Sequence, residues 1–235
     1  MKTGAVILAG GSGKRMGGAV PKQYMELGGQ PLICYSLRTF QESFIDAIVL
    51  VCGAGQEEYC RRELVEAYGF TKVCAIVPGG KERYHSVMQG VKALPADVDY
   101  IFIHDGARAF VSQGVLRRGL EDVREYSASV AAIPSRDTVK RADEQGFVKD
   151  TPKRAELWLV QTPQIFSASL IREAYGKLAE REEELLAAGT EITDDAMIVE
   201  LLTKERVHLF MGEAQNIKLT SPEDLKYAEW ILSGR

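Results

Sequence analysis

Residues 5–16 run Ala5-Val-Ile-Leu-Ala-Gly-Gly-Ser-Gly-Lys-Arg-Met16, and Lys22 follows shortly after them. The apolar half of this segment has the length and composition of a buried strand. The glycines that come next lack a Cβ, so the backbone there can adopt positive φ and approach a ligand closely. Arg15 and Lys22 add two cations at the same end of the strand, an arrangement that suits a polyphosphate. A plain strand-to-helix turn is the alternative, but such a turn needs neither cation.

Apolar runs of strand length alternate with helical patterns through the first half of the chain. Strands are predicted at 5–9, 47–52, 73–77, 100–104 and 128–133, and helices at 31–40, 57–68, 84–94 and 112–126. This alternation predicts an α/β fold with a Rossmann-like, mostly parallel sheet and helices on both faces. Ligands of such sheets bind beyond the carboxyl ends of the strands. We therefore expect the turns at Gly10, Gly79-Gly80 and Asp105-Gly106 to converge on one site.

Residues 136–156 break this pattern. Short alternating pieces around the Glu144-Gln-Gly146 turn predict a β-hairpin arm that protrudes from the sheet. The arm has too few apolar residues to make a core of its own, so it either extends into solvent or lies on another subunit, and we expect the second, in a homodimer.

The remaining sequence returns to the sheet and completes one predicted domain, residues 1–235. Strands are expected at 157–160, 164–166, 207–211 and 216–220, and helices at 167–188, at 196–202 and after Ser221. Thr193 or Asp194 can cap the short helix, which is an alternative to a functional role for Thr193. The Glu182-Glu-Glu184 run is predicted to be a solvated helix face. Lys218, inside an apolar patch, either extends its charge to solvent or serves a site.

Composition excludes several kinds of partner. The formal net charge is −4 and no run of five basic residues occurs, which argues against a nucleic-acid surface. No apolar run reaches transmembrane length, so we expect a soluble, cytoplasmic protein. The four cysteines show no Cys-x-x-Cys pairing and the three histidines are scattered, which predicts reduced core thiols and no zinc site.

The opening glycine turn differs from the two commonest nucleotide-binding loops. A P-loop continues Gly-Lys with Ser or Thr, but Gly13-Lys14 is followed here by Arg15. A dinucleotide-binding turn needs glycine at position 16 and an acidic residue after the second strand, where this chain has Met16 and Cys52. The sequence therefore argues against both a P-loop enzyme and an NAD-dependent oxidoreductase.

The order of residues from Leu8 to Met16, with Pro21-Lys22, resembles the signature of nucleotidyltransferases that join an NTP to a phosphorylated sugar or polyol. Within that class the chain is most similar to the 2-C-methyl-D-erythritol 4-phosphate cytidylyltransferase family. The likeness extends over nearly the whole chain. It rests on Pro21-Lys-Gln-Tyr24, Gly79-Gly80 with Arg83 and Ser86, His104-Asp105 with Ala107-Arg108, Arg136-Asp-Thr138, Gln161-Thr-Pro-Gln164, Ile192-Thr-Asp194 and Asn216-Ile-Lys218.

The resemblance implies that a phosphate oxygen of the polyol attacks the α-phosphorus of CTP in line and releases pyrophosphate, with Mg²⁺ bridging the CTP phosphates. It implies Arg15 and Lys22 as catalytic cations and Asp105 as the carboxylate nearest the metal. The substrate phosphate is assigned to Arg154, Lys218, Thr138 and Thr193, and CTP to Ala9, Gly10, Gly11, Gly13, Gly79, Gly80, Lys81, Ser86, Asp105 and Gly106. In this family the arm crosses to the other subunit, so Thr138 and Arg154 would complete the partner's site. Lys81 stands where the family often has Asp.

Two alternatives remain from the sequence. Ribitol 5-phosphate cytidylyltransferases share the glycine turn, Pro-Lys-Gln and Asn-Ile-Lys, whereas Ser86, Arg136-Asp-Thr138 and the arm fit the erythritol family better. A nucleotide-binding protein that had lost the chemistry would not need cations placed for a transition state, and Arg15, Lys22 and Lys218 are all present.

Overall fold

The first predicted strand, β1 (Thr3–Ala9), lies inside a seven-stranded sheet in the computed structural model, which describes residues 1–11 and 21–234. The strand order is β11-β7-β10-β6-β1-β4-β5. The other strands are β4 (Ala47–Cys52), β5 (Val73–Pro78), β6 (Tyr100–Asp105), β7 (Ala128–Pro134), β10 (Trp158–Ser167) and β11 (His208–Met211). All pairs are parallel except those of β10, which runs antiparallel to both β6 and β7. The mostly parallel α/β fold is confirmed.

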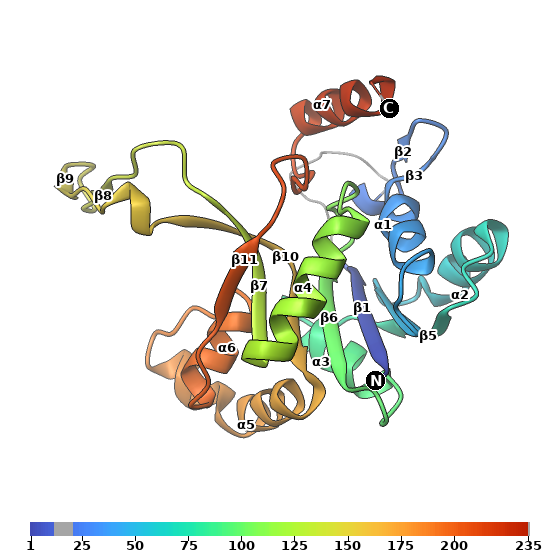
Figure 1. The fold of residues 1–235 in the computed structure, drawn as a ribbon, viewed down its shortest axis with the longest axis horizontal. Helices are drawn as coiled ribbons and strands as arrows, with labels where there is room; N and C mark the ends of the chain where they lie inside the picture. Colours follow the sequence, from blue (N-terminus) through green and yellow to red (C-terminus); the bar gives the residue numbers. More distant parts are fainter. Residues whose placement is uncertain (12–20, 235) are drawn as a thin grey trace.

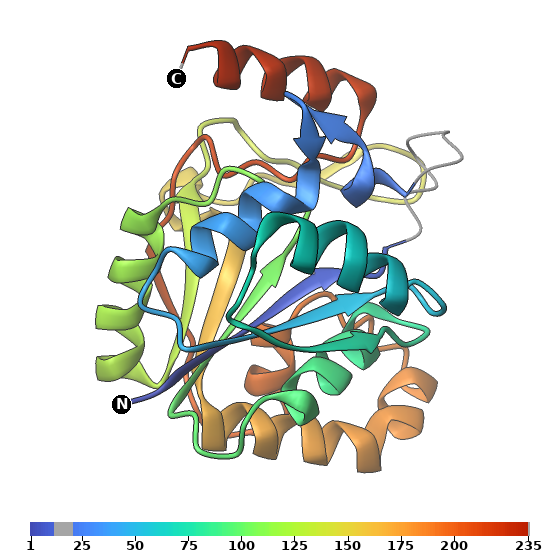
Figure 2. The same cartoon turned by 90° about the vertical axis from the view of Figure 1, so that its right-hand side faces the viewer.

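Helices cover both faces of the sheet (Figure 2). They are α1 (Leu32–Gln41), α2 (Glu57–Tyr59) with a π-helical continuation (Cys60–Glu66), α3 (Arg83–Ala93), α4 (Gln113–Tyr126), α5 (Ala168–Ala187), α6 (Asp195–Leu202) and α7 (Pro222–Ser233). Alternate residues of β1 separate the two cores: Ile7 packs in the cluster of α1 and α4, and Val6 in that of α3 and α5. This is the two-residue period of a strand buried on both sides.

Local signals set several helix boundaries as expected. Ser112 Oγ accepts a hydrogen bond from the Val115 N–H at 3.1 Å, and Asp194 caps α6 by accepting from the Met197 N–H at 2.9 Å. Ser221 caps α7, where Pro222 occupies the first turn.

The arm projects away from the sheet (Figure 1). It carries the short antiparallel strands β8 (Arg141–Ala142) and β9 (Val148–Asp150), joined through Gly146 at φ 87°. Phe147 is 69% exposed at its tip. A second hairpin, β2 (Glu26–Leu27) and β3 (Gln30–Pro31), packs under α7 and was not predicted.

Two expectations about the fold are wrong. Residues 216–220 do not form a strand. The Leu219 N–H donates to the carbonyl of Ala107, which lies just beyond the end of β6, at 2.9 Å, so this segment crosses the end of the sheet instead of extending its edge. Cys74 is an exposed thiol, unlike the three buried cysteines, because it lies on β5 at the edge of the sheet.

Candidate active site

A pocket of about 390 Å³ opens at the carboxyl edge of the sheet. The register of the parallel strands accounts for its position, since Leu8 lies opposite Asp105 and Ala9 opposite Cys52. The turns that leave β1 and β6 therefore start side by side, and the turn after β5 starts one strand further along, because Cys52 of β4 lies opposite Pro78; the three turns converge as expected. The described residues lining the pocket are Leu8, Ala9, Gly10, Gly11, Lys22, Gln23, Gly80, Lys81, Glu82, Arg83, Ser86, Asp105, Ala107 and Lys218.

The start of the first glycine turn is close-packed, not left-handed. Gly10 and Gly11 both lack the positive φ that glycine permits. A Cβ on Gly10 would stand 3.3 Å from the Cys52 carbonyl oxygen, a tight contact, so the absence of a side chain lets the backbone here pack closely on β4. Gln23, 3% exposed, donates from Nε2 to the Ala9 carbonyl and ties the segment that carries Lys22 to the end of β1.

The second glycine turn is held by the first turn of α3. Gly79 N–H donates to the Cys52 carbonyl at 2.7 Å, which aligns the ends of β4 and β5. Gly80 N–H donates to Ser86 Oγ at 3.1 Å. A Cβ on Gly80 would meet the Cβ of His85 at 2.3 Å, so no other residue fits this position without displacing α3.

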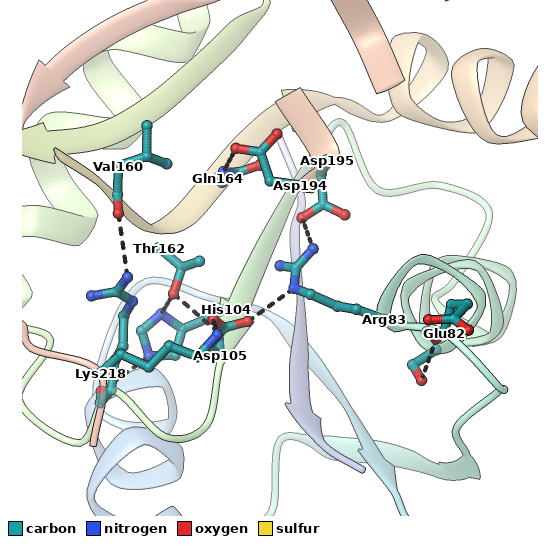
Figure 3. A network of polar contacts seen from close by, with 12 residues as sticks. Glu82, Arg83, His104, Asp105, Val160, Thr162, Gln164, Asp194, Asp195 and Lys218 are labelled. Carbon is teal, nitrogen blue, oxygen red and sulfur yellow. Dashed lines mark hydrogen bonds and ion pairs between the residues drawn. The ribbon is translucent and has the colours of Figure 1, made fainter. Parts of the chain in front are cut away.

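A chain of charged side chains begins at Lys218, Asp105 and Arg83 in the pocket lining and continues behind it to the buried Asp195 (Figure 3). Asp105 lies between two cations, with Arg83 Nε 3.2 Å from Oδ1 and Lys218 Nζ 2.8 Å from Oδ2. Arg83 reaches on through Nη1 to Asp195 Oδ2 at 2.9 Å. Lys22 Nζ donates to the Leu219 carbonyl at 3.3 Å, which brings the two lysines to one wall.

These contacts decide the charge states. Burial opposes ionisation of Asp105, but Arg83 and Lys218 outweigh it and hold the pKa of Asp105 well below its usual range. Asp195 is fully buried, and burial raises its pKa although Arg83 and a 2.6 Å hydrogen bond from Tyr175 Oη oppose the shift. Arg83 therefore lies as a cation between Asp105, which ionises readily, and Asp195, whose ionised form burial makes unfavourable.

A neutral histidine supports Asp105 from behind. Thr162 Oγ1 accepts from the Asp105 N–H at 3.0 Å and lies 3.0 Å from His104 Nδ1. His104 Nε2 lies 3.2 Å from the Arg108 carbonyl, so the consistent tautomer carries its proton on Nε2 and accepts at Nδ1. Burial lowers the pKa of His104 to about 4 and keeps the ring uncharged.

The pocket brings together most of the residues that the sequence singled out, and leaves others away from it. Lining it are Ala9, Gly10, Gly11, Lys22, Gly80, Lys81, Ser86, Asp105 and Lys218. Gly79 and Gly106 stand behind the lining, where a Cβ on Gly106 would meet Ile33 Cδ1 at 2.2 Å. Thr138, Arg154 and Thr193 are exposed outside it. Gly13 and Arg15 lie outside the described residues.

Several residues of the site escaped the sequence reasoning. Arg83 was part of a recognised motif without a role, and its place beside Asp105 depends on the packing of α3 against β1 and β4. Asp195 follows the predicted cap residue Asp194, but nothing local indicates that it faces Arg83. Gln23 could have been found, since a buried amide beside a strand end commonly pairs with a free carbonyl.

The fold and the pocket define the class. A mostly parallel sheet binds its ligands at the carboxyl edge, and here that edge carries two glycine turns, two lysines and a carboxylate, in agreement with the nucleotidyltransferase class that the sequence resembles. The sequence pattern of the 2-C-methyl-D-erythritol 4-phosphate cytidylyltransferase family matches residues 3–234. The chain therefore belongs to the 2-C-methyl-D-erythritol 4-phosphate cytidylyltransferase family, and it is an enzyme of that kind.

Individual relatives agree over their full length. The 2-C-methyl-D-erythritol 4-phosphate cytidylyltransferases of Lachnoclostridium phytofermentans and Clostridium perfringens are 42% and 44% identical; the matches cover 98% and 97% of this chain and 96% and 97% of those proteins. The crystal structure of 4-diphosphocytidyl-2C-methyl-D-erythritol synthase from Anaerococcus prevotii has a TM-score of 0.83 at 32% identity, covering 99% of this chain and 96% of that one. The crystal structure of 2-C-methyl-D-erythritol 4-phosphate cytidylyltransferase from Thermus thermophilus has a TM-score of 0.78 at 29% identity, covering 99% of this chain and 100% of that one.

Two further findings concern the part of the chain that the structure describes. Its helices are all too short or too polar to cross a membrane. Its His, Cys, Asp and Glu side chains form no cluster of three that could hold a metal ion by themselves.

Proposed function

We propose that the pocket binds CTP and 2-C-methyl-D-erythritol 4-phosphate and joins them, giving the CDP-linked polyol and pyrophosphate. The observation that carries this proposal is the convergence of both glycine turns, Lys22, Lys218 and Asp105 in one pocket of a chain that belongs to this family. No described side chain needs to act as a general base, because a phosphate monoester is already largely dianionic near neutral pH.

The chemistry then depends on placed positive charge. An oxygen of the monoester attacks the α-phosphorus of CTP in line, the bond from that phosphorus to the bridging oxygen breaks, and pyrophosphate leaves. Negative charge grows on the equatorial and leaving oxygens, so cations fixed beforehand stabilise the transition state. We assign this role to Lys22 and, by family resemblance, to Arg15. Lys218 is assigned to the phosphate of the attacking polyol, and its contact with Asp105 keeps it oriented beforehand.

The glycine turns suit a pyrimidine nucleoside. Ala9, Gly10 and Gly11 of the first turn line the pocket together with Gly80, Lys81 and Glu82 of the second, and backbone groups of these turns offer donors and acceptors to the base and ribose. Lys81 is exposed at the edge of this turn, so its charge is available to the nucleotide phosphates instead of an acidic contact to the ribose.

A divalent cation fits the acidic residues present. Glu82 and Asp105 are the acids that line the described part of the pocket, and Asp105 is ionised. Mg²⁺ is commonly held by one or two carboxylates together with substrate phosphates and waters, which matches this sparse set. When bound with CTP it would neutralise charge on the leaving group. Asp105 would be its protein ligand.

The exposed arm supports a shared site in a homodimer. Thr138 and Arg154 lie at the base of the arm, away from this chain's own pocket, and both are exposed. Phe147 and Val148, 69% and 59% exposed, give the arm an apolar tip that the described part of this chain leaves uncovered. We assign Thr138 and Arg154 to the substrate phosphate in the partner's site and Thr193 to the same phosphate in its own.

Pyrophosphate release tests the proposal directly. The protein is incubated with CTP, Mg²⁺ and either 2-C-methyl-D-erythritol 4-phosphate or ribitol 5-phosphate, and faster turnover of ribitol phosphate would overturn the substrate assignment. Lys22→Ala should lower kcat at least about a hundredfold, the effect of losing one preorganised electrostatic contact. CTP binding should weaken far less. A protein that only binds nucleotide would release no pyrophosphate in either form.

A further inference from the structure

Glu182 of α5 contacts the start of α3, although its acidic run is predicted to be a solvated face. Its carboxylate accepts a hydrogen bond from Tyr84 Oη at 2.8 Å and pairs with His85 Nε2 at 2.9 Å. The side chains of His85 and Glu182 are only 26% and 23% exposed. The hydrogen bond from His85 lowers the pKa of Glu182, and the charge of Lys81 acts in the same direction. Glu182 is therefore an ionised acceptor directed at the neighbouring helix.

His85 in turn holds the backbone of the nucleotide turn. Its Nδ1 accepts from the Glu82 N–H at 3.2 Å, so the proton of the neutral ring lies on Nε2 and points at Glu182. The Cβ of His85 also closes against Gly80, since a Cβ on that glycine would stand only 2.3 Å from it. Glu182 thus fixes both the tautomer and the orientation of a ring that contacts two residues of the turn.

The turn held in this way forms one side of the pocket. Gly80, Lys81, Glu82, Arg83 and Ser86 all line it. Resting on the proposed function that this pocket binds CTP, we propose that Glu182 is a positioning residue that acts through His85 to hold the Gly79–Glu82 turn in its nucleotide-binding shape. Glu182 is not among the described residues that line the pocket. Its loss should therefore weaken CTP binding and leave the polyol phosphate and the chemical step nearly unchanged.

The same helix supplies a matched control. Glu184 is two residues along, 65% exposed, and pairs with Arg181 at 2.8 Å within α5. Glu184→Ala removes an equal charge and an ion pair from the same helix without touching α3. Tyr84→Phe removes the other partner of Glu182 and leaves the His85 contact.

The test compares Glu182→Ala, His85→Ala, the double variant and Glu184→Ala by calorimetric titration with CTP and Mg²⁺ and by steady-state kinetics. Glu182→Ala should raise the Kd and the KM for CTP about fivefold, the effect of losing one hydrogen bond of ordinary strength. The KM for the polyol phosphate and kcat should stay within about twofold. The double variant should be no worse than the worse single one, because both changes break one path. Glu184→Ala and Tyr84→Phe should match the wild type.

The outcomes separate this inference from the proposed function. A wild-type protein that neither binds CTP nor releases pyrophosphate overturns the proposed function. Wild-type turnover with unchanged CTP affinity in Glu182→Ala overturns the positioning role, as do additive effects in the double variant or an equal rise in both KM values. If Glu182→Ala does not fold, Glu182→Met keeps the side-chain volume without the acceptors, and the same criteria apply to it.

Discussion

Replacing Asp195 tests the buried charge chain behind the pocket. Asp195→Ala removes a fully buried carboxylate that lies 2.9 Å from Arg83 Nη1 and accepts from Tyr175 Oη at 2.6 Å. Breaking a buried ion pair by deleting one partner costs about 3–5 kcal/mol. Arg83 keeps Asp105 at 3.2 Å, so we expect the lower end of that range, about 3 kcal/mol.

Chemical and thermal unfolding measure this loss. For a chain of this length, about 3 kcal/mol corresponds to a fall in Tm of roughly 6–12 °C. Tyr175→Phe, which removes only the hydrogen bond, should cost about 1.5 kcal/mol. Asp195→Asn keeps an acceptor for Tyr175 but not the charge, and should lie between the two. A free energy of unfolding for Asp195→Ala within about 1 kcal/mol of the wild type would contradict the interpretation that Asp195 stabilises the fold by balancing the buried charge of Arg83.

Other expectations concern the pocket wall, its buried histidine, the metal and the arm. The pKa of His104 falls from 6.5 to about 4 on folding, so between these pH values the unfolded chain binds a proton at this ring and the folded chain does not. As the pH is lowered from 7 to 4, the wild type should therefore lose up to about 3 kcal/mol more unfolding free energy than His104→Gln, and parallel pH curves for the two proteins would refute this. Gly106→Ala, whose Cβ would stand 2.9 Å from the Leu8 carbonyl oxygen, should lower the free energy of unfolding in urea by about 1–3 kcal/mol and weaken CTP binding. Unchanged stability and unchanged CTP affinity would contradict this prediction. Chelation with EDTA should abolish pyrophosphate release, and Mg²⁺ should restore it; turnover that survives chelation would exclude a metal requirement. Deleting residues 140–150 should lower activity and dimerisation together, as measured by turnover and sedimentation, whereas a fully active monomer would rule out a shared site.

Local patterns accounted for much of the fold. The continuous apolar strands, the caps at Ser112 and Asp194 and the hairpin arm were all predictable, because each depends on neighbours within a few residues. The convergence of the glycine turns was also predictable, since a parallel sheet brings the carboxyl ends of its strands to one edge. The family likeness added the proposed roles of Lys22 and Lys218, which spacing alone left open.

Side chains that look equivalent in the sequence have different environments in the packed structure. Glu182 and Glu184 both belong to an acidic run on α5, yet one contacts His85 and the other stays in solvent. The prediction of a strand at 216–220 was wrong, because a strand must pair along the edge of a sheet and this segment crosses the end of the strands instead.

By itself, then, the sequence determined the strands and helices of the main α/β alternation and the positions of the glycine turns, because these follow from periodicity and residue chemistry over short distances. The tertiary structure alone decided that β10 enters the sheet antiparallel between β6 and β7, that Arg83 joins Asp105 to Asp195, and that Glu182 holds His85. The physical reason is that these contacts join residues far apart in the chain. Their energies depend on burial and mutual distance, which exist only after the helices have packed on the sheet.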